Sequence, residues 1–146
     1  MGASMTGIIE WTDQAQCATR PELNQPLAAP RWHEDHLHGV LFDTDKEYDF
    51  FAAIAGARNR FGKPPLIAPR GVPPHLSGPA RRCFEDFGSD LAGWLHLSEI
   101  ERCIAHVSDG SFVTGFEVDC AMEFMRLLVS KLTDPHVRLV FSIESP

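Results

Sequence analysis

The stretch VRLVFSIE at residues 137–144 has the clearest secondary-structure pattern of this 146-residue chain. Apolar side chains recur at every second position, namely Val137, Leu139, Phe141 and Ile143. An alternation of period two is typical of a β-strand with one buried and one exposed face. Shorter β-prone runs at residues 6–11 and 37–42 predict two further strands. We therefore expect a small sheet with a strand from each end of the chain.

The most unusual predicted helix covers residues 46–57. Asp43 or Asp45 precedes it and would cap its first turn by accepting hydrogen bonds from free backbone N–H groups. After Asp49 the run FFAAIAGA contains no charged residue. A helix that is apolar nearly all round belongs in the interior of a protein. We therefore expect this helix to be buried.

Three more helices are predicted, over residues 77–84, 98–107 and 117–132. The second would begin at Ser98-Glu99-Ile100-Glu101, which has the pattern of a capping box. The third repeats apolar residues at intervals of three and four, and we assign its Met and Phe side chains to the core. The predicted fold class is α+β, a short mixed or antiparallel sheet with about four helices packed on one face.

The chain length fits one domain, which we assign to residues 5–146. Residues 1–4 precede a second methionine and resemble an expression scar. Residues 12–36 are polar and interrupted by prolines, so a long loop or arm that contacts a partner is predicted there. Residues 61–79 hold six of the 11 prolines and predict a stiff, irregular loop.

Composition excludes several classes of function. Hydrophobic residues make up 44% and charged residues 23%, as in folded globular domains. A net charge of −7 argues against DNA, RNA or an anionic membrane as partner. The sequence shows neither a long apolar run nor a signal-peptide pattern, so a cytoplasmic protein is expected. The four cysteines form no Cys-x-x-Cys pair, so we expect buried reduced thiols and no cofactor.

The distribution of charge is uneven along the chain. Residues 50–84 contain no Asp or Glu, yet they hold six of the 13 cations, and all 20 acidic residues lie elsewhere. The six cations are Arg58, Arg60, Lys63, Arg70, Arg81 and Arg82. Arginine forks suit phosphate and carboxylate oxygens, so one interpretation is a site for an anionic ligand. The other interpretation is that these arginines pair with acids from other parts of the fold.

A second polar cluster, HEDHLH at residues 33–38, contains three histidines and two acids. On a strand, His36 and His38 would point the same way, as paired metal ligands can. The spacing matches no strong metal motif, so a solvated loop leading into a strand is the preferred interpretation. A metal site or a proton-transfer histidine is the alternative.

Two segments, YDFFAAIAGARN at residues 48–59 and IAPRGVP at residues 67–73, together resemble an uncharacterised family common in phages and prophages. Members share Ala-Gly-x-Arg-Asn and Pro-Arg-Gly-x-Pro motifs, followed by a Trp-Leu pair that opens a helix, similar to Trp94-Leu95. The resemblance covers roughly residues 40–146. Members typically open with Met-Gly-Cys-Asp-Ile-His and carry His-Ser-His-Ser before the Trp, whereas this chain has TGIIEW at residues 6–11 and SDLAGW at residues 89–94.

The resemblance implies a phage-linked accessory protein that counters host defence in the host cytoplasm. Combined with the arginine segment, it leads us to expect binding and sequestration of a small anionic, nucleotide-type ligand. The candidate ligand-binding residues are Arg58, Asn59, Arg60, Arg70, Gly71, Arg81, Arg82 and Trp94. One alternative is a nucleotide-degrading or nucleotide-modifying enzyme with a histidine of residues 33–38 as base. Another is a protein–protein inhibitor with an acidic surface, and the sequence is compatible with a homo-oligomer.

Overall fold

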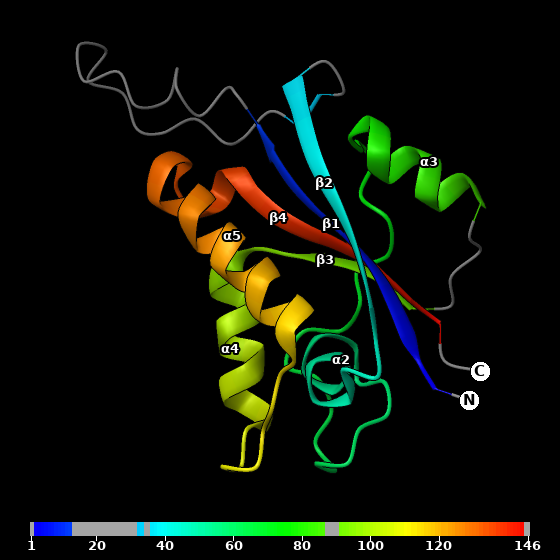
Figure 1. The fold of residues 1–146 in the computed structure, drawn as a ribbon, viewed down its shortest axis with the longest axis vertical. Helices are drawn as coiled ribbons and strands as arrows, with labels where there is room; N and C mark the ends of the chain where they lie inside the picture. Colours follow the sequence, from blue (N-terminus) through cyan, green and yellow to red (C-terminus); the bar gives the residue numbers. More distant parts are fainter. Residues whose placement is uncertain (1, 13–31, 34–35, 87–90, 145–146) are drawn as a thin grey trace.

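The computed structural model describes residues 2–12, 32–33, 36–86 and 91–144 of the chain. Within them, four strands form one antiparallel sheet in the order β2-β1-β4-β3 (Figure 1). The strands are β1 (Ser4–Thr12), β2 (Leu37–Asp45), β3 (Leu91–Leu95) and β4 (Val137–Glu144). The predicted α+β class is confirmed, and the sheet is antiparallel throughout these residues.

The two ends of the chain meet in the middle of the sheet (Figure 1). Strand β1 pairs with β2 on one side and with β4 on the other, and Ser4 has a partner on both sides. Ala3 is buried in the core. Residues 3 and 4, which we compared with an expression scar, therefore take part in the fold.

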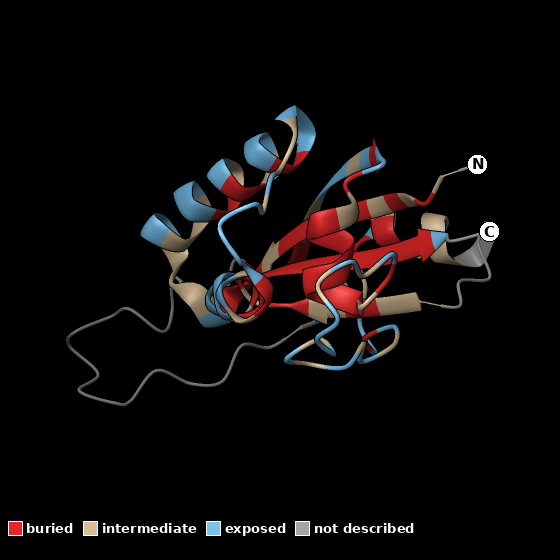
Figure 2. Cartoon of the chain, turned by 90° about the horizontal axis from the view of Figure 1, so that it is seen from below, coloured by how far each residue is buried: buried red, intermediate tan, exposed pale blue. Residues whose placement is uncertain are grey.

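Helices cover both faces of the sheet, so the expectation of helices on one face is wrong. Helices α2 (Tyr48–Ala55), α4 (Leu97–Val107) and α5 (Phe116–Leu132) pack on one face, and α3 (Gly78–Asp86) lies on the other (Figure 1). Consequently, all of β4 except Glu144 is buried, on both faces (Figure 2). The half-buried strand predicted for residues 137–144 is therefore a fully covered one.

Helix α2 is the buried helix that its apolar sequence predicts. All of its residues after Tyr48 are buried. Its N-cap is Glu47, so the expected cap by Asp43 or Asp45 is wrong, because β2 continues through Asp45 before the helix begins. Gly56 ends the helix with a φ of 72°, a conformation that glycine adopts without steric cost, and donates its N–H to Ala52.

The helices at residues 98–107 and 117–132 are confirmed with small shifts. Helix α4 has His96 as its N-cap, and Glu99 accepts the His96 N–H at 3.0 Å. The expected cap by Ser98 is wrong, because the Ser98 hydroxyl donates to Asp134 at 2.7 Å instead. In α5 both methionines are buried and Phe124 packs against the core, as expected, whereas Phe116, which precedes the predicted helix, is 78% exposed.

Strand β3 was not predicted. Trp94 and Leu95 end this strand, and the following helix begins at Leu97 rather than at the Trp-Leu pair. The ring of Phe141 lies across Gly93 on the neighbouring strand, where an added Cβ would come within 2.6 Å of it. The strand is short, and its central glycine has no side chain that could reveal a period of two.

The remaining predictions concern loops and cysteines. Residues 61–77 lack regular structure, as their proline content predicts, and the short helix at residues 77–84 is confirmed as α3. Most of the predicted arm at residues 12–36, including Cys17, lies outside the described residues. Cys103 is buried and Cys120 is exposed, so burial of every thiol is wrong. No helix among the described residues is long and apolar enough to cross a membrane.

Candidate functional site

The first group of predicted site residues forms a tight turn after α2. Arg58 has a φ of 51°, and its guanidinium carbon lies 5.8 Å from the centre of the Tyr48 ring. The Asn59 side chain closes the turn, because it accepts the Phe61 N–H at 3.0 Å and donates to the Lys63 carbonyl. Asn59 therefore holds the loop that positions its two neighbouring arginines.

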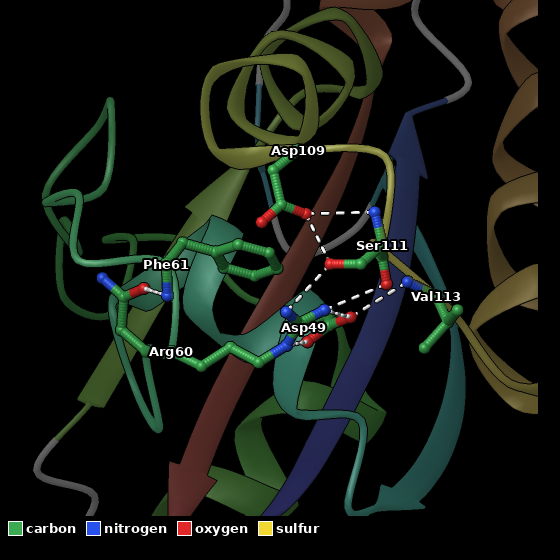
Figure 3. A network of polar contacts seen from close by, with 7 residues as sticks. Asp49, Arg60, Phe61, Asp109, Ser111 and Val113 are labelled. Atoms are coloured by element: carbon green, nitrogen blue, oxygen red, sulfur yellow. Dashed lines mark hydrogen bonds and ion pairs between the residues drawn. The ribbon is translucent and has the colours of Figure 1, made fainter.

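Arg60 connects α2 to the segment that follows α4 (Figure 3). Its Nε and one terminal nitrogen each donate to a different oxygen of Asp49, both at 2.9 Å. Its terminal nitrogens also donate to the hydroxyl and the carbonyl of Ser111, each at 2.9 Å. Asp109 in turn accepts the Ser111 N–H at 3.0 Å. For Arg60, the interpretation as an ion-pair partner of an acid elsewhere in the fold is confirmed.

The Asp49 carboxylate is the centre of this network. Its pKa is lowered mainly by the hydrogen bond from Arg60, although burial opposes the shift, and the Val113 N–H lowers it further. A carboxyl group with a lower pKa in the folded state stabilises the fold at pH values above its unfolded pKa, near 3.8. That contribution is lost as the pH falls through the folded-state pKa.

We therefore expect the free energy of unfolding of Asp49→Asn to depend less on pH in the acidic range than that of the wild type. The wild-type protein should lose free energy of unfolding more steeply than the variant below about pH 4, because the variant has no carboxylate to protonate there. Urea unfolding at a series of pH values checks this. Asp45→Asn, which removes an exposed carboxylate from β2, is the control. Parallel profiles for wild type and Asp49→Asn would contradict the assignment.

A cavity of about 430 Å³ opens beside this network, at the start of α2. Lys46, Tyr48 and Arg60 line it, together with Glu47, Asp49 and residues 113–115. The two acids are already engaged, because Glu47 accepts the Gly115 N–H at 2.7 Å and Asp49 accepts the Val113 N–H at 2.9 Å. The cavity thus combines two cationic side chains with an aromatic ring.

Arg70, Gly71 and Trp94 form a second group at the start of α4. The Arg70 guanidinium makes a bidentate ion pair with Glu99 and lies 4.4 Å from the centre of the Trp94 ring. Burial raises the pKa of Glu99, but the hydrogen bonds from Arg70 and the His96 N–H outweigh it and lower the pKa overall. Gly71, with a φ of 80°, donates its N–H to Ala92 at 2.9 Å. This group fastens the proline-rich loop to β3 and α4.

The predicted site residues therefore do not form one site. The loop of residues 61–70 runs along α4, since Lys63 donates to the His106 carbonyl near the helix C-terminus and Arg70 binds Glu99 near the N-terminus. An 11-residue helix is roughly 16 Å long, which separates Arg70 from the Arg60 network. Arg81 and Arg82 belong to α3, on the opposite face of the sheet.

Sequence reasoning missed a buried ion pair in the middle of the sheet. Glu10 of β1 and Arg138 of β4 are cross-strand partners, with 0% and 2% exposure. Arg138 Nε donates to Glu10 at 2.8 Å, and the Ser77 N–H donates to the other Glu10 oxygen at 2.6 Å. Burial lowers the pKa of Arg138, and the Glu10 carboxylate opposes that shift.

Two neighbouring groups complete the surroundings of Arg138. A terminal nitrogen donates to the His75 carbonyl, and the guanidinium carbon lies 4.0 Å from the centre of the Trp32 ring. The alternation within residues 137–144 assigned Arg138 to an exposed face, so it gave no sign of this burial. The one available signal was Glu10 itself, an acid within the β-prone run of residues 6–11.

The histidines of residues 33–38 are placed in different surroundings. The His33 ring lies 5.5 Å from that of His75, and the His38 ring stacks on Trp11 with 5.6 Å between centres. His36 is exposed. Glu34 and Asp35 lie outside the described residues. Among the residues that are described, no group of three His, Cys, Asp or Glu side chains is arranged to hold a metal ion.

Comparison with known proteins identifies no relative of this chain. Neither a protein-family model, a curated protein nor a solved structure matches the chain.

Proposed function

We propose that the protein binds a small anionic ligand of nucleotide type in the cavity at the start of α2. The observation that carries the proposal is the charge arrangement of this cavity. Lys46 and Arg60 line it, while the acids beside them already accept hydrogen bonds from within the protein. An anion entering the cavity would meet Lys46, which is exposed, because Arg60, Glu47 and Asp49 are already engaged within the protein. Charge-assisted hydrogen bonds are the strongest that such a ligand forms.

The uncharged walls favour a nucleotide over a bare anion. Tyr48 offers an aromatic ring, and Val113, which is 69% exposed, offers an apolar surface. Arg58 lies over the same Tyr48 ring. A base could lie against Tyr48 and Val113 while a phosphate reaches Lys46. A volume of about 430 Å³ is within the range of small-molecule sites.

The resemblance to a phage family supports a role in countering host defence. An accessory protein of that kind would sequester a nucleotide-derived defence signal of the host without altering it. The test is to incubate the purified protein with a panel of nucleotides, remove the unbound material, denature the protein and analyse what is released. Release of an intact nucleotide supports sequestration. An altered nucleotide supports an enzyme instead, and the absence of any bound nucleotide contradicts both.

Replacing Lys46 is expected to weaken this binding. Lys46→Gln should lower the affinity for the retained nucleotide by about tenfold, because it removes one charge-assisted contact from an exposed side chain. Isothermal titration calorimetry measures the change. Lys131→Gln removes another exposed lysine, from α5, and should leave the affinity unchanged. Equal affinities for wild type and Lys46→Gln would contradict the placement of the ligand in this cavity. Arg70→Gln should also bind normally, since Arg70 lies at the other end of α4.

A further inference from the structure

A second cavity, of about 550 Å³, lies between α4 and α5, which stand side by side in Figure 1. Its floor is apolar and comes from three elements: Ile104 of α4, Met122 of α5 and Phe112 of the connecting segment. Met122 belongs to the core, and Ile104 and Phe112 pack against that core while remaining partly exposed. The groove therefore brings the hydrophobic core to the surface of the molecule.

The rim of this groove is predominantly acidic. Glu101 contributes from α4, and Asp119 and Glu123 contribute from α5, with Arg126 as the cation among the lining residues. The α5 residues follow one another at intervals of three and four, so they share one face of the helix. Phe116, which is 78% exposed, precedes Asp119 by three residues and extends that face with an apolar side chain.

Arg126 shows where a cation is accommodated in the groove. It lies 2.8 Å from Glu123 and 3.8 Å from Glu101, so its guanidinium bridges the two helices. These contacts are weak, because all three side chains are about half exposed or more. A cation supplied by a partner can therefore replace Arg126 between the two acids at little cost.

We propose that the groove between α4 and α5 binds a basic amphipathic helix of a partner protein. An apolar side chain of that helix would lie on the floor of Ile104, Phe112 and Met122, and its Lys or Arg side chains would face Glu101 and Glu123. Laying an amphipathic helix into an apolar groove is a recurrent mode of peptide recognition. Charge complementarity selects a basic occupant, because three carboxylates and one guanidinium line the groove and the chain carries a net charge of −7.

The groove is distinct from the nucleotide cavity of the proposed function. Phe112 lines the groove, whereas the next residue, Val113, lines the cavity at the start of α2. Thr114 borders both. The segment that joins α4 to α5 thus separates the two, and loss of one binding activity does not imply loss of the other.

The experiment uses the full chain and a fluorescein-labelled amphipathic helical peptide of leucine and lysine, with binding followed by fluorescence anisotropy. The double variant Glu101→Gln/Glu123→Gln should bind the peptide about tenfold more weakly than the wild type, because two exposed ion pairs are lost. The control Asp45→Asn/Glu144→Gln removes two exposed carboxylates from the sheet and changes the net charge equally. It should bind as the wild type does.

Two further measurements separate the groove from general attraction between opposite charges. Arg126→Gln should bind the peptide a few-fold more tightly, since it removes the competing cation. A peptide with serine in place of leucine should lose binding, because it cannot use the apolar floor. Equal weakening in both double variants, or unchanged binding of the serine peptide, would overturn the proposal. Failure of the leucine–lysine peptide to bind at all would overturn it as well.

Discussion

Replacing Arg138 with methionine is expected to lower the free energy of unfolding by about 3–5 kcal/mol, which is the usual cost of removing one partner from a buried ion pair. Glu10, with 0% exposure, would keep its Ser77 contact but lose its cation. The Glu10 carboxylate would then remain buried with its charge uncompensated. The loss of the long aliphatic stem is small, because methionine replaces most of its volume.

Urea unfolding of Arg138→Met beside the wild type measures this loss. The double variant Glu10→Leu/Arg138→Met removes both charges and should recover a large part of the stability, as replacement of buried pairs by apolar residues often does. Recovery in the double variant attributes the loss to the unpaired Glu10 rather than to poor packing of the new side chain. A single variant within about 1 kcal/mol of the wild type would contradict the buried pair.

Replacing Phe51 with alanine is the second change with a large expected effect, a loss of about 3–5 kcal/mol. Phe51 is completely buried in α2, within the cluster that joins this helix to α4, α5 and the sheet. Its ring also meets Tyr48 edge to face, with 6.4 Å between centres. The truncation leaves a cavity in the core beside α2, the helix that contains Tyr48 and Asp49.

Leu127→Ala is the control for this change. Leu127 is 56% exposed on α5, so its truncation should change stability by no more than about 0.5 kcal/mol. Both variants are compared with the wild type by urea unfolding and circular dichroism. Similar losses from the two truncations would show that α2 is not the buried element described. A large loss from Phe51→Ala alone supports it.

Local patterns in the sequence predicted most of the secondary structure, because periodicity and capping depend on near neighbours in the chain. The apolar run after Asp49 predicted a buried helix, and α2 is that helix. The same reasoning failed at two residues whose side chains suit a helix cap. Asp45 was interpreted as a cap but ends a strand, and Ser98 was interpreted as a cap but donates to Asp134.

The candidate site was predictable only in part. The absence of acids from residues 50–84 predicted either an anion site or pairing with acids elsewhere in the fold, and Arg60 and Arg70 are paired in this way. The partners of those arginines could not be read from the sequence, because they come from distant segments. Arg60 binds Asp49 and Ser111, and Arg70 binds Glu99. Which cations line a cavity depends on this pairing.

The sequence by itself determined the α+β class, the strands at both ends of the chain and the burial of α2, since each of these follows from the local spacing of apolar residues. Only the tertiary structure decided that α3 covers the second face of the sheet. That placement buries Glu10 and Arg138, 128 residues apart, as a pair, although the alternation assigned Arg138 to an exposed face. The physical reason is that alternation along a strand distinguishes its two faces but contains no information about what packs against each of them.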